Sequence, residues 1–569
     1  MPTARFPLIA PLVGGALGAV FFLAVYGPAM VRPTNLGWTM RHDTQTYVLA
    51  FHHFRREPWR WPPGAIAGVG HPVGTSIGNT DAIPLLAFPL KLVEAWLPET
   101  LQYLGLWVFA CYILQGVFGA LLVRQVTADL TLQVLGALLF VQTPALLHRF
   151  GHTALCAHWT LLAAIWIAGD RAHDWQWRLG AWAMACGVVA AIQPYLAVMV
   201  VALALADVAG DAWGNLRGGR HGRTLAGVAA VVAVTVAVFW TSGYFLLGTG
   251  GDFGREGVGY FSMNLLSPVI PTGYSGLLPE IPTATPGQYE GLVYFGAGWL
   301  ALTAAALAVG ARRGFVLPPL RLGWVVVVLF LLLAISPVVT AGESVLLDLS
   351  ASAPALLAVF RSSGRFAWLA MYVIFAATLA TLTSRLPRRA AVAVVAAGVG
   401  LQTLDLSGAY GRVLARAHDP VWATWTDPLQ SPVWEAALPH YRHLVMAPPD
   451  MCAAVWSPPA GDHLPFSLLA GRHGVTVNSG NAGRYDVAGV LSYCAALRAD
   501  LEAGRVHNDS LYVLNPAMRQ VLGASTSTPL ACGMANGFAV CATERSVRRW
   551  REAATAAGVL MTPVPAVQP

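Results

Sequence analysis

Apolar runs without charged residues, each about long enough to cross a bilayer, recur from Pro7 to Thr403. A hydrocarbon core about 30 Å thick needs roughly 20 apolar residues per helical span, because a helix rises only about 1.5 Å per residue. The 569 residues are 56% hydrophobic and only 11% charged, as in proteins that lie mostly in lipid. The runs therefore predict a mainly α, polytopic membrane protein.

Ten such runs are predicted to span the membrane, and one of them is too long for a single helix. The runs are 7–26, 101–123, 130–147, 153–169, 179–206, 224–247, 291–310, 322–340, 366–383 and 390–404. The run 179–206 contains Gln193-Pro194-Tyr195 near its middle. Proline beside a polar residue is a natural break in a helix, so splitting this run gives about eleven spans.

Arginines favour the count of eleven, because basic residues gather in cytoplasmic loops. The net charge of +7 comes almost wholly from arginine, since Lys91 is the only lysine. With the split, thirteen arginines fall on the cytoplasmic side, and without it the nine from Arg217 onward move outside. We therefore expect a multi-pass protein of the cytoplasmic (inner) membrane, with a cytoplasmic N-terminus, a retained first span and a periplasmic C-terminus.

The composition becomes that of a soluble domain after Leu406. Candidate strands H-L-V-M-A, V-T-V-N, S-L-Y-V-L and F-A-V-C alternate with helical stretches near 466–470, 487–503 and 517–521. That alternation predicts a periplasmic α/β domain at 407–569, with a disordered tail from about Thr555. Residues 1–406 form the predicted transmembrane domain, in which 27–100 is the first periplasmic loop.

Cysteines divide between the two predicted domains. Cys111, Cys156 and Cys186 lie in apolar runs, whereas four cysteines lie in the C-terminal domain: Cys452, Cys494, Cys532 and Cys541. No C-x-x-C pair is present, which argues against a zinc or redox motif. Four cysteines facing an oxidising space fit two disulfides, whose pairing the sequence leaves open.

The first loop contains two short helix patterns that suit juxtamembrane helices. The first runs from about Asp43 to Glu57, and the second opens at Asp81. Four apolar residues of the first pattern share one face, with Arg55 and Arg56 off that face: Tyr47, Ala50, Phe51 and Phe54. Such a helix would lie in the membrane interface, with Arg55, Arg56 and Glu57 on its solvated or headgroup-facing side.

Asp43 and Asp81 are the candidate catalytic residues of this loop. Each stands at the start of a predicted helix, where N-capping is the ordinary explanation for an aspartate. Two carboxylates beside histidines and arginines also suit a general base that removes a proton from a hydroxyl. A divalent metal ion near Asp43 is an open alternative, although no resident metal site is predicted.

Arginines near the outer ends of spans are candidate ligands for a lipid phosphate. Arg361 and Arg365 stand four residues apart in F-R-S-S-G-R-F, and Arg149 lies in another short outer loop. The pair Arg361 and Arg365 fits the role of interfacial anchors about as well as that of a phosphate clamp. Against anchoring, short outer loops otherwise avoid arginine, and guanidinium groups bind phosphate bidentately.

Further polar residues near span ends are candidate substrate contacts: His42, His152, Tyr195, Asn264 and Glu290. His148 and His152 have a spacing that suits a metal, but such histidines more often bond neighbouring helices or headgroups. Asn264 and Glu290 belong to an aromatic loop that suits carbohydrate stacking, although an ordinary aromatic belt explains much of it.

The order of these features resembles the GT-C superfamily of membrane glycosyltransferases. Several pieces more closely resemble an uncharacterised bacterial family of multi-span proteins grouped with GT-C enzymes: R-H-D-T-Q-T-Y, N-T-D-A-I-P-L-L-A, R-F-G-H-T-A-L-C-A-H-W, Q-P-Y-L-A-V-M-V, Y-F-S-M-N-L-L-S-P, Q-Y-E-G-L-V-Y-F-G and F-R-S-S-G-R-F. The resemblance covers nearly the whole chain.

The resemblance implies transfer of a sugar from a polyprenyl-phosphate carrier to an acceptor on the outer face. Asp43 matches the first-loop aspartate of such enzymes, which acts as a base or a metal contact. It is flanked by His42 and Thr44, so the usual D-x-D, E-x-D or D-D pair is missing. Asp81 is the candidate second carboxylate, and the acceptor is a glycan, a lipid or a protein.

Two alternatives come from other classes of protein. A transporter or flippase of lipid-linked saccharides should hold ionisable residues at mid-membrane, where each costs roughly 2.5 to 3.5 kcal/mol, and these spans are nearly free of them. An assembly protein that has lost activity would also fit the missing acidic pair. Nucleic-acid binding is not expected, because no basic run is interleaved with aromatics.

Overall fold

The computed structural model describes residues 8–170, 172–215, 221–246, 258–484, 486–524, 530–548, 551–556, 558–559 and 562–563. The chain folds into two compact units, each formed from three segments. Unit 1 contains Met1–Pro33, Tyr103–Val238 and Phe253–Ala423. Unit 2 contains Thr34–Gln102, Phe239–Asp252 and Thr424–Pro569.

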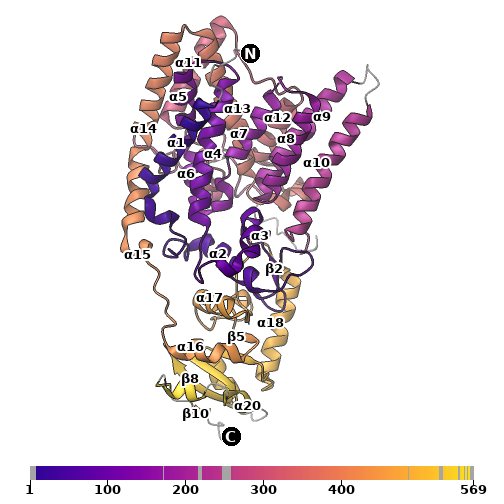
Figure 1. The fold of residues 1–569 in the computed structure, drawn as a ribbon, viewed down its shortest axis with the longest axis vertical. Helices are drawn as coiled ribbons and strands as arrows, with labels where there is room; N and C mark the ends of the chain where they lie inside the picture. The colour runs from indigo at the N-terminus through magenta and orange to yellow at the C-terminus, as the bar shows by residue number, and fades with distance from the viewer. Residues whose placement is uncertain are drawn as a thin grey trace. The chain divides into compact units, whose positions relative to one another are not determined.

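Unit 1 is a bundle of helices (Figure 1). They are α1 (Ile9–Tyr26), α4 (Leu104–Arg124), α5 (Leu130–Val141), α6 (Pro144–His148), α7 (Trp159–Gly169), α8 (Trp175–Ala190), α9 (Pro194–Asn215), α10 (His221–Thr241), α11 (Ala297–Arg313), α12 (Gly323–Ile335), α13 (Ala367–Arg385), α14 (Arg388–His418) and α15 (Pro420–Ala423). A two-stranded hairpin follows α12, with strands β3 (Val338–Ala341) and β4 (Ser344–Asp348). The predicted break at Gln193-Pro194 is confirmed, because α8 ends at Ala190 and α9 begins at Pro194.

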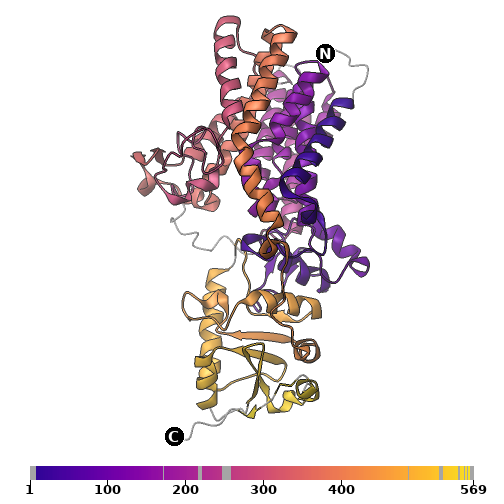
Figure 2. The same cartoon turned by 90° about the vertical axis from the view of Figure 1, so that its left-hand side faces the viewer.

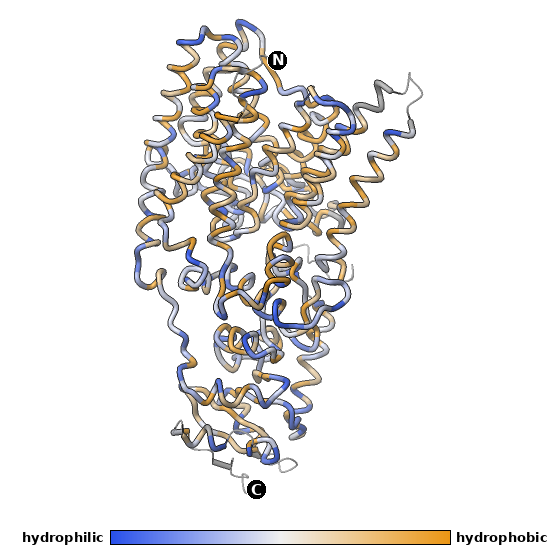
Figure 3. Tube along the Cα trace, viewed as in Figure 1, coloured by the Kyte–Doolittle hydropathy of each residue, from blue (hydrophilic) through white to orange (hydrophobic). Residues whose placement is uncertain are grey.

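Six helices among the described residues are long and apolar enough to cross a membrane: Ile9–Tyr26, Leu104–Arg124, Leu130–Gly151, Gly222–Thr241, Ser363–Arg385 and Arg388–His418. Figure 3 shows the apolar character of these segments. They are the helices of a multi-pass membrane protein. A helix also lies at each of the other predicted runs, although the count of eleven spans stays a prediction.

Small residues let the helices of unit 1 approach closely. A Cβ atom on Gly14 of α1 would lie 2.4 Å from the carbonyl oxygen of Gly116 on α4, so the two backbones touch. Beside this contact, the hydroxyls of Tyr26 and Tyr112 are 3.0 Å apart. Such approaches drive helix association in lipid, where hydrophobic burial gives no advantage.

The last long helix, α14, continues past residue 406, where the sequence analysis divides the chain. Asp405 lies on this helix and is fully buried. Its carboxylate accepts hydrogen bonds from the Tyr294 hydroxyl at 2.7 Å and the Ala297 N–H at 2.9 Å. The carboxyl group is thus hydrogen-bonded inside unit 1, and the helix continues past it. The division at 406/407 stays a prediction.

The C-terminal part of unit 2 contains a six-stranded sheet in the order β10-β8-β9-β7-β5-β6. Its strands are β5 (His443–Ala447), β6 (Thr476–Val477), β7 (Ser510–Leu514), β8 (Leu530–Ala535), β9 (Phe538–Thr543) and β10 (Thr562–Pro563). Its helices are α16 (Pro432–Ala437), α17 (His463–His473), α18 (Val487–Glu502), α19 (Pro516–Ala524), α20 (Glu544–Val547) and α21 (Arg551–Ala556). β5 pairs in parallel with β6 and β7, and the other pairings are antiparallel. The α/β character predicted here is confirmed, whereas most of the predicted tail lies outside the described residues.

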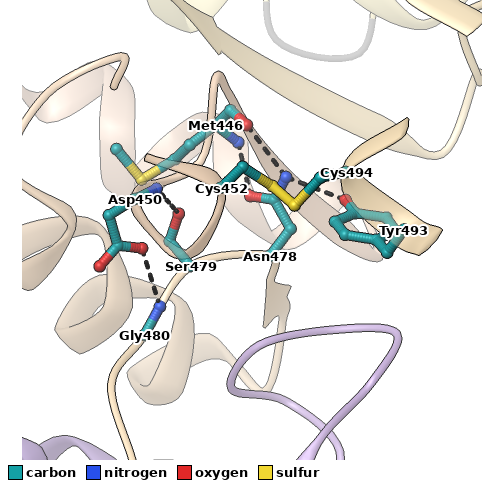
Figure 4. Close-up of a disulfide and its surroundings, with 8 residues drawn as sticks. All are labelled: Met446, Asp450, Cys452, Asn478, Ser479, Gly480, Tyr493 and Cys494. Carbon is teal, nitrogen blue, oxygen red and sulfur yellow. Dashed lines mark hydrogen bonds between the residues drawn. A yellow bond between two sulfur atoms is a disulfide. The ribbon is translucent and has the colours of Figure 1, made fainter. Parts of the chain in front are cut away.

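Two disulfides join the four cysteines of this region, as predicted. Cys452 bonds to Cys494 and Cys532 bonds to Cys541. The second bridge joins directly opposed residues of β8 and β9. The first bridge lies near Asp450, whose carboxylate accepts the N–H of Gly480 at 3.1 Å (Figure 4).

Most of the predicted first loop belongs to the same unit as this sheet. It contains α2 (His42–Arg56), β1 (Ala65–Ile66), β2 (Thr75–Ser76) and α3 (Pro84–Leu92). Residues 68–71 lie along β6: the Val477 N–H donates to the Gly68 carbonyl at 2.7 Å, and the His71 N–H donates to the Val477 carbonyl at 3.0 Å. His53 Nε2 of α2 lies 2.9 Å from the Ser467 carbonyl of α17. The loop is therefore an added strand and helix of the C-terminal fold.

The prediction that Arg55 lies on a solvated or headgroup-facing side of α2 is wrong. Arg55 is 4% exposed, and its guanidinium donates to the carbonyls of Pro98, at 2.9 Å, and Glu99. Burial lowers the pKa of His52 to about 3 and the pKa of His53 to about 4, so both imidazoles are neutral. The loop after α3 supplies the carbonyl groups that make this burial tolerable.

Candidate functional site

The main candidate site lies in unit 1, where one carboxylate joins two arginines. Oε2 of Glu290 accepts hydrogen bonds from Arg149 Nη1 at 2.9 Å and from Arg365 Nη2 at 2.6 Å. The other oxygen, Oε1, lies 3.4 Å from His152 Nε2. We call Arg149, His152, Glu290 and Arg365 the arginine–glutamate cluster.

Short 3-10 turns present these side chains, and a pair of glycines brings two of the turns together. Glu290 lies on Pro286–Gly291, and Arg365 lies on Ser363–Phe366. A Cβ atom on Gly291 would lie 2.6 Å from the Cα atom of Gly364, so a larger residue would push the turns apart. The Gly364 N–H also donates to the Phe261 carbonyl at 3.0 Å. This backbone contact fixes the carboxylate beside the guanidinium.

The cluster is buried and carries more positive than negative charge. Arg149, Glu290 and Arg365 are 1%, 6% and 8% exposed. Burial alone would raise the pKa of Glu290, but the hydrogen bond from His152 and the charges of Arg365 and Arg149 lower that pKa well below its usual range. The carboxylate is ionised and is shared by two guanidinium groups of the cluster.

Part of the hydrogen-bonding capacity of the cluster is unused. Nε of Arg149 is buried and has no hydrogen-bond partner among the described residues. His152 is the most exposed member, since about a quarter of its side chain is accessible. A buried donor without an acceptor is unfavourable, so the cluster is suited to receive an anionic or carbonyl oxygen.

Aromatic rings flank all three predicted phosphate ligands. The guanidinium carbon of Arg365 lies 4.8 Å from the ring centre of Tyr195, and that of Arg149 lies 5.6 Å from Trp368. Arg361 is exposed and lies over Phe261 at 5.2 Å. Planar guanidinium groups held over rings stay oriented for bidentate bonds.

The structure brings together most of the unit 1 residues singled out from the sequence. Four of them form the arginine–glutamate cluster. Tyr195 lies beside the cluster, with its ring facing the guanidinium of Arg365. Asn264 is used elsewhere, because its side chain donates to Gln288 Oε1 at 3.1 Å and to the Gly342 carbonyl at 2.8 Å. This arrangement favours a structural role for Asn264, and its contact with substrate stays a prediction.

Asp43 lies in unit 2, on the exposed side of the first turn of α2. The N-cap residue of α2 is Arg41, so the capping explanation for Asp43 is wrong. The side chain of His42 lies outside the described residues.

Asp81 also lies in unit 2, at a strained point of the backbone. It has φ +52°, and Ile83 two residues later has φ +50°. The second helix begins only at Pro84 with Ile83 as its N-cap, so Asp81 does not cap it either. Such conformations cost roughly 1–3 kcal/mol each and tend to gather at functional sites.

Two neighbours of Asp81 were not singled out from the sequence. These neighbours are Tyr244 and Arg484. The pKa of Tyr244 is raised mainly by burial and then by the negative charge of Asp81, whereas the positive charge of Arg484 lowers it. The backbone of Asn79 accepts the N–H of Gly483 at 2.9 Å, which joins this stretch to the segment after β6. These residues come from three distant segments, so no local pattern marks them. Among the described residues, no three His, Cys, Asp or Glu side chains form a group suited to a metal.

Comparison with protein families decides the classification. Residues 15–407 match the family described as Domain of unknown function (DUF6311), and residues 433–543 match the DUF6311 C-terminal domain. The chain belongs to the DUF6311 family. The expected membership of an uncharacterised multi-span family is thereby confirmed. No curated protein matches the sequence significantly.

Solved structures similar to this DUF6311 protein include oligosaccharyltransferases of Archaeoglobus fulgidus. One is the archaeal oligosaccharyltransferase AglB in complex with an inhibitory peptide and a dolichol-phosphate. The two sequences are 12% identical, the alignment covers 95% of this chain and 75% of that chain, and the TM-score is 0.40. The apo form has 12% identity, 93% and 74% coverage and a TM-score of 0.44. At such low scores we draw nothing about activity from the similarity.

Proposed function

We propose that this DUF6311 protein is a glycosyltransferase that moves a sugar from a polyprenyl-phosphate-linked donor to an acceptor at the outer face of the cytoplasmic membrane. The observation that carries the proposal is the arginine–glutamate cluster, in which two buried guanidinium groups share one carboxylate. Burial of guanidinium groups is costly, and an anion that accepts their hydrogen bonds offsets that cost. The phosphate of a lipid carrier supplies that anion beside the membrane.

Arg149 and Arg365 act on the leaving group in this proposal. Guanidinium groups bind phosphate through paired N–H donors, and Nε of Arg149 has no acceptor in the described part of the chain. As the bond between sugar and phosphate breaks, negative charge grows on the phosphate oxygens. The arginines therefore stabilise the transition state more than the ground state, which is what accelerates a reaction. Exposed Arg361 adds a further cation.

Asp43 is the proposed general base, and Asp81 the second carboxylate. The acceptor hydroxyl oxygen forms a bond to the anomeric carbon of the sugar while its proton passes to the Asp43 carboxylate. The bond from that carbon to the carrier phosphate breaks, and the phosphate leaves with the electron pair. One bond forms as one breaks on the opposite side, so the sugar inverts.

A transfer assay on membranes that contain the full chain tests this function. Labelled polyprenyl-phosphate sugar is supplied, and label that enters acceptor is measured for wild type, Asp43→Asn and Arg361→Ala. We expect Asp43→Asn to lower the rate by about 10²- to 10⁴-fold, because a general base contributes that much. Glu502→Gln on α18 is the control, since Glu502 is exposed and pairs with surface Arg498.

The assay also separates the proposed enzyme from its alternatives. Normal transfer by both Asp43→Asn and Arg361→Ala would contradict the proposal. Movement of a labelled lipid-linked saccharide across vesicles that contain the protein, without transfer, would instead identify a flippase. Binding of the saccharide without movement or transfer would identify an assembly protein.

A further inference from the structure

The hairpin β3–β4 of unit 1 exposes an unusual amount of apolar surface. Every residue of β4 is exposed, and Leu346 is 59% exposed. Its exposed apolar side chains, with those of adjoining loops, are Val345, Leu346, Leu347, Leu349, Leu265 and Leu266. Contiguous apolar patches of this kind mark interaction surfaces. We call this set the hairpin patch.

The patch is one connected surface, although its residues come from two segments. The Leu265 N–H donates to the Thr340 carbonyl of β3 at 2.9 Å, and Asn264 Nδ2 donates to the Gly342 carbonyl at 2.8 Å. Residues 258–296 and the hairpin form a lobe, drawn in pink to salmon at the left of Figure 2. Consecutive strand residues point to opposite faces, so Val345 and Leu346 make both faces of β4 apolar.

The helix before the hairpin indicates what covers the patch. α12 exposes apolar residues at helical spacing, as a lipid-facing stripe does: Val325, Val328, Leu329 and Leu332. Only Ser336 and Pro337 separate the end of α12 from β3. The hairpin patch thus continues the lipid-facing surface of the helix.

The length of α12 places the hairpin at membrane depth. A helix of 13 residues is only about 20 Å long, whereas the hydrocarbon core is about 30 Å thick. Arg321 stands directly before the helix and suits one membrane surface, so the other end stops short of the opposite surface. The chain that follows must cross the remaining depth or lie against a thinned bilayer.

We infer that β3–β4 lies in the headgroup–acyl boundary of the bilayer, with the side chains of β4 among lipid tails. The free edge of a two-stranded ribbon cannot lie in dry hydrocarbon, where its backbone groups would lose all partners. At the boundary, water and headgroups still reach that edge while leucines enter the acyl region. The inference does not depend on the proposed enzymatic activity.

Fluorescent labels on the full-length protein in lipid vesicles test this placement. The free cysteines of the described chain, Cys111, Cys156 and Cys186, are buried, which favours labelling at introduced sites. Leu346→Cys and Val345→Cys test the two faces of β4 separately. Leu329→Cys on α12 is the lipid-facing control, and Arg498→Cys on α18 is the control in water.

Lipids with a nitroxide near the headgroup should quench both hairpin labels more strongly than lipids with a nitroxide at the bilayer centre. The label on Leu329→Cys, in the middle of α12, should show the opposite order, because it lies deeper in the hydrocarbon. Solvent-like emission from either hairpin label, equal to that of Arg498→Cys, would overturn the placement. Rapid disulfide cross-linking of two Leu346→Cys chains, with little lipid quenching, would show that a second copy covers the patch and would also overturn it.

Discussion

Arg365 donates both Nε–H and Nη2–H to a single oxygen of Glu290, at 3.2 and 2.6 Å. A bidentate pair usually engages both carboxylate oxygens, one for each donor. Here Arg149 donates to the same oxygen, and the second oxygen is left for His152. Glu290 therefore holds two guanidinium groups and one imidazole around itself, and the removal of its charge should affect all three.

Glu290→Gln should lower the free energy of unfolding by about 3–5 kcal/mol, because it removes the negative charge that two buried guanidinium groups share. Thermal unfolding of the full-length protein in lipid nanodiscs measures the effect. Glu343→Gln, at the exposed turn of the hairpin, should stay within about 0.5 kcal/mol of wild type. The double variant Glu290→Gln/Arg365→Gln should have a higher free energy of unfolding than Glu290→Gln alone. Equal stability of Glu290→Gln and Glu343→Gln would show that the charge is not needed.

A short-chain polyprenyl phosphate should stabilise the wild-type protein if the cluster binds phosphate. A ligand at about one hundred times its dissociation constant raises the free energy of unfolding by about 2.7 kcal/mol. The rise in melting temperature should vanish in Arg149→Gln and persist in Arg498→Gln, which changes an exposed arginine of α18. The corresponding uncharged polyprenol is the ligand control. An undiminished shift in Arg149→Gln would place phosphate binding elsewhere.

The two disulfides should differ in their contribution to stability. A bridge restricts the unfolded chain more when it closes a longer loop. Cys452–Cys494 has a sequence separation of 42 and Cys532–Cys541 one of 9. Replacing the first pair by alanine should cost about 4 kcal/mol and the second about 3 kcal/mol. Thermal unfolding of both double variants under the same conditions measures which disulfide contributes more to stability. A larger loss of stability on removal of Cys532–Cys541 would contradict the prediction.

His463 should make the stability of unit 2 depend on pH. Burial alone would lower the pKa of His463, but its 2.9 Å contact with the Asp450 carboxylate raises that pKa above its usual value. The folded state then holds the proton more tightly than the unfolded state does. The stabilisation is fully present below about pH 6.5 and is lost as pH rises through the higher folded pKa. Melting curves of His463→Gln should be flatter over this range, whereas His507→Gln, an exposed histidine, should follow wild type.

Lys91 should react with amine reagents at unusually low pH. Burial is the largest cause that lowers its pKa to about 8, and its ammonium group donates to the Phe54 carbonyl at 2.6 Å. Since it is the only lysine, peptide mass spectrometry after acylation reports on one site. The midpoint of reactivity should lie near pH 8 in the folded protein and near about 10.4 in the denatured chain. The same midpoint in both states would contradict the shift.

Features set by short patterns were predictable from the sequence. The break before Pro194, the helix beginning near Asp43 and the two disulfides each depend on residues that are close together or on composition. Arg149, Glu290 and Arg365 were each singled out, but their mutual contact was not. These residues are 141 and 75 positions apart, and only the packing of Gly291 against Gly364 brings two of them together.

The burial of α2 could not be predicted for the same reason. Its amphipathic pattern is that of an interfacial helix, and no nearby residue shows that carbonyl groups of Pro98 and Glu99 will bind Arg55. Nor does the sequence around Gly68 reveal that this segment extends a sheet formed far along the chain. Tertiary partners decided both cases.

The pairing of residues 68–71 with β6, and of His53 with Ser467, has a consequence for biosynthesis. The two ends of the latter contact are 414 residues apart, so tens of seconds of translation separate them at roughly 5–20 residues per second. Until then, α2 has emerged from the ribosome without the surface against which it packs. The first loop can therefore reach its native state only after synthesis has passed Val477, so a chain that terminates earlier would carry Asp43 and Asp81 on an unfinished loop.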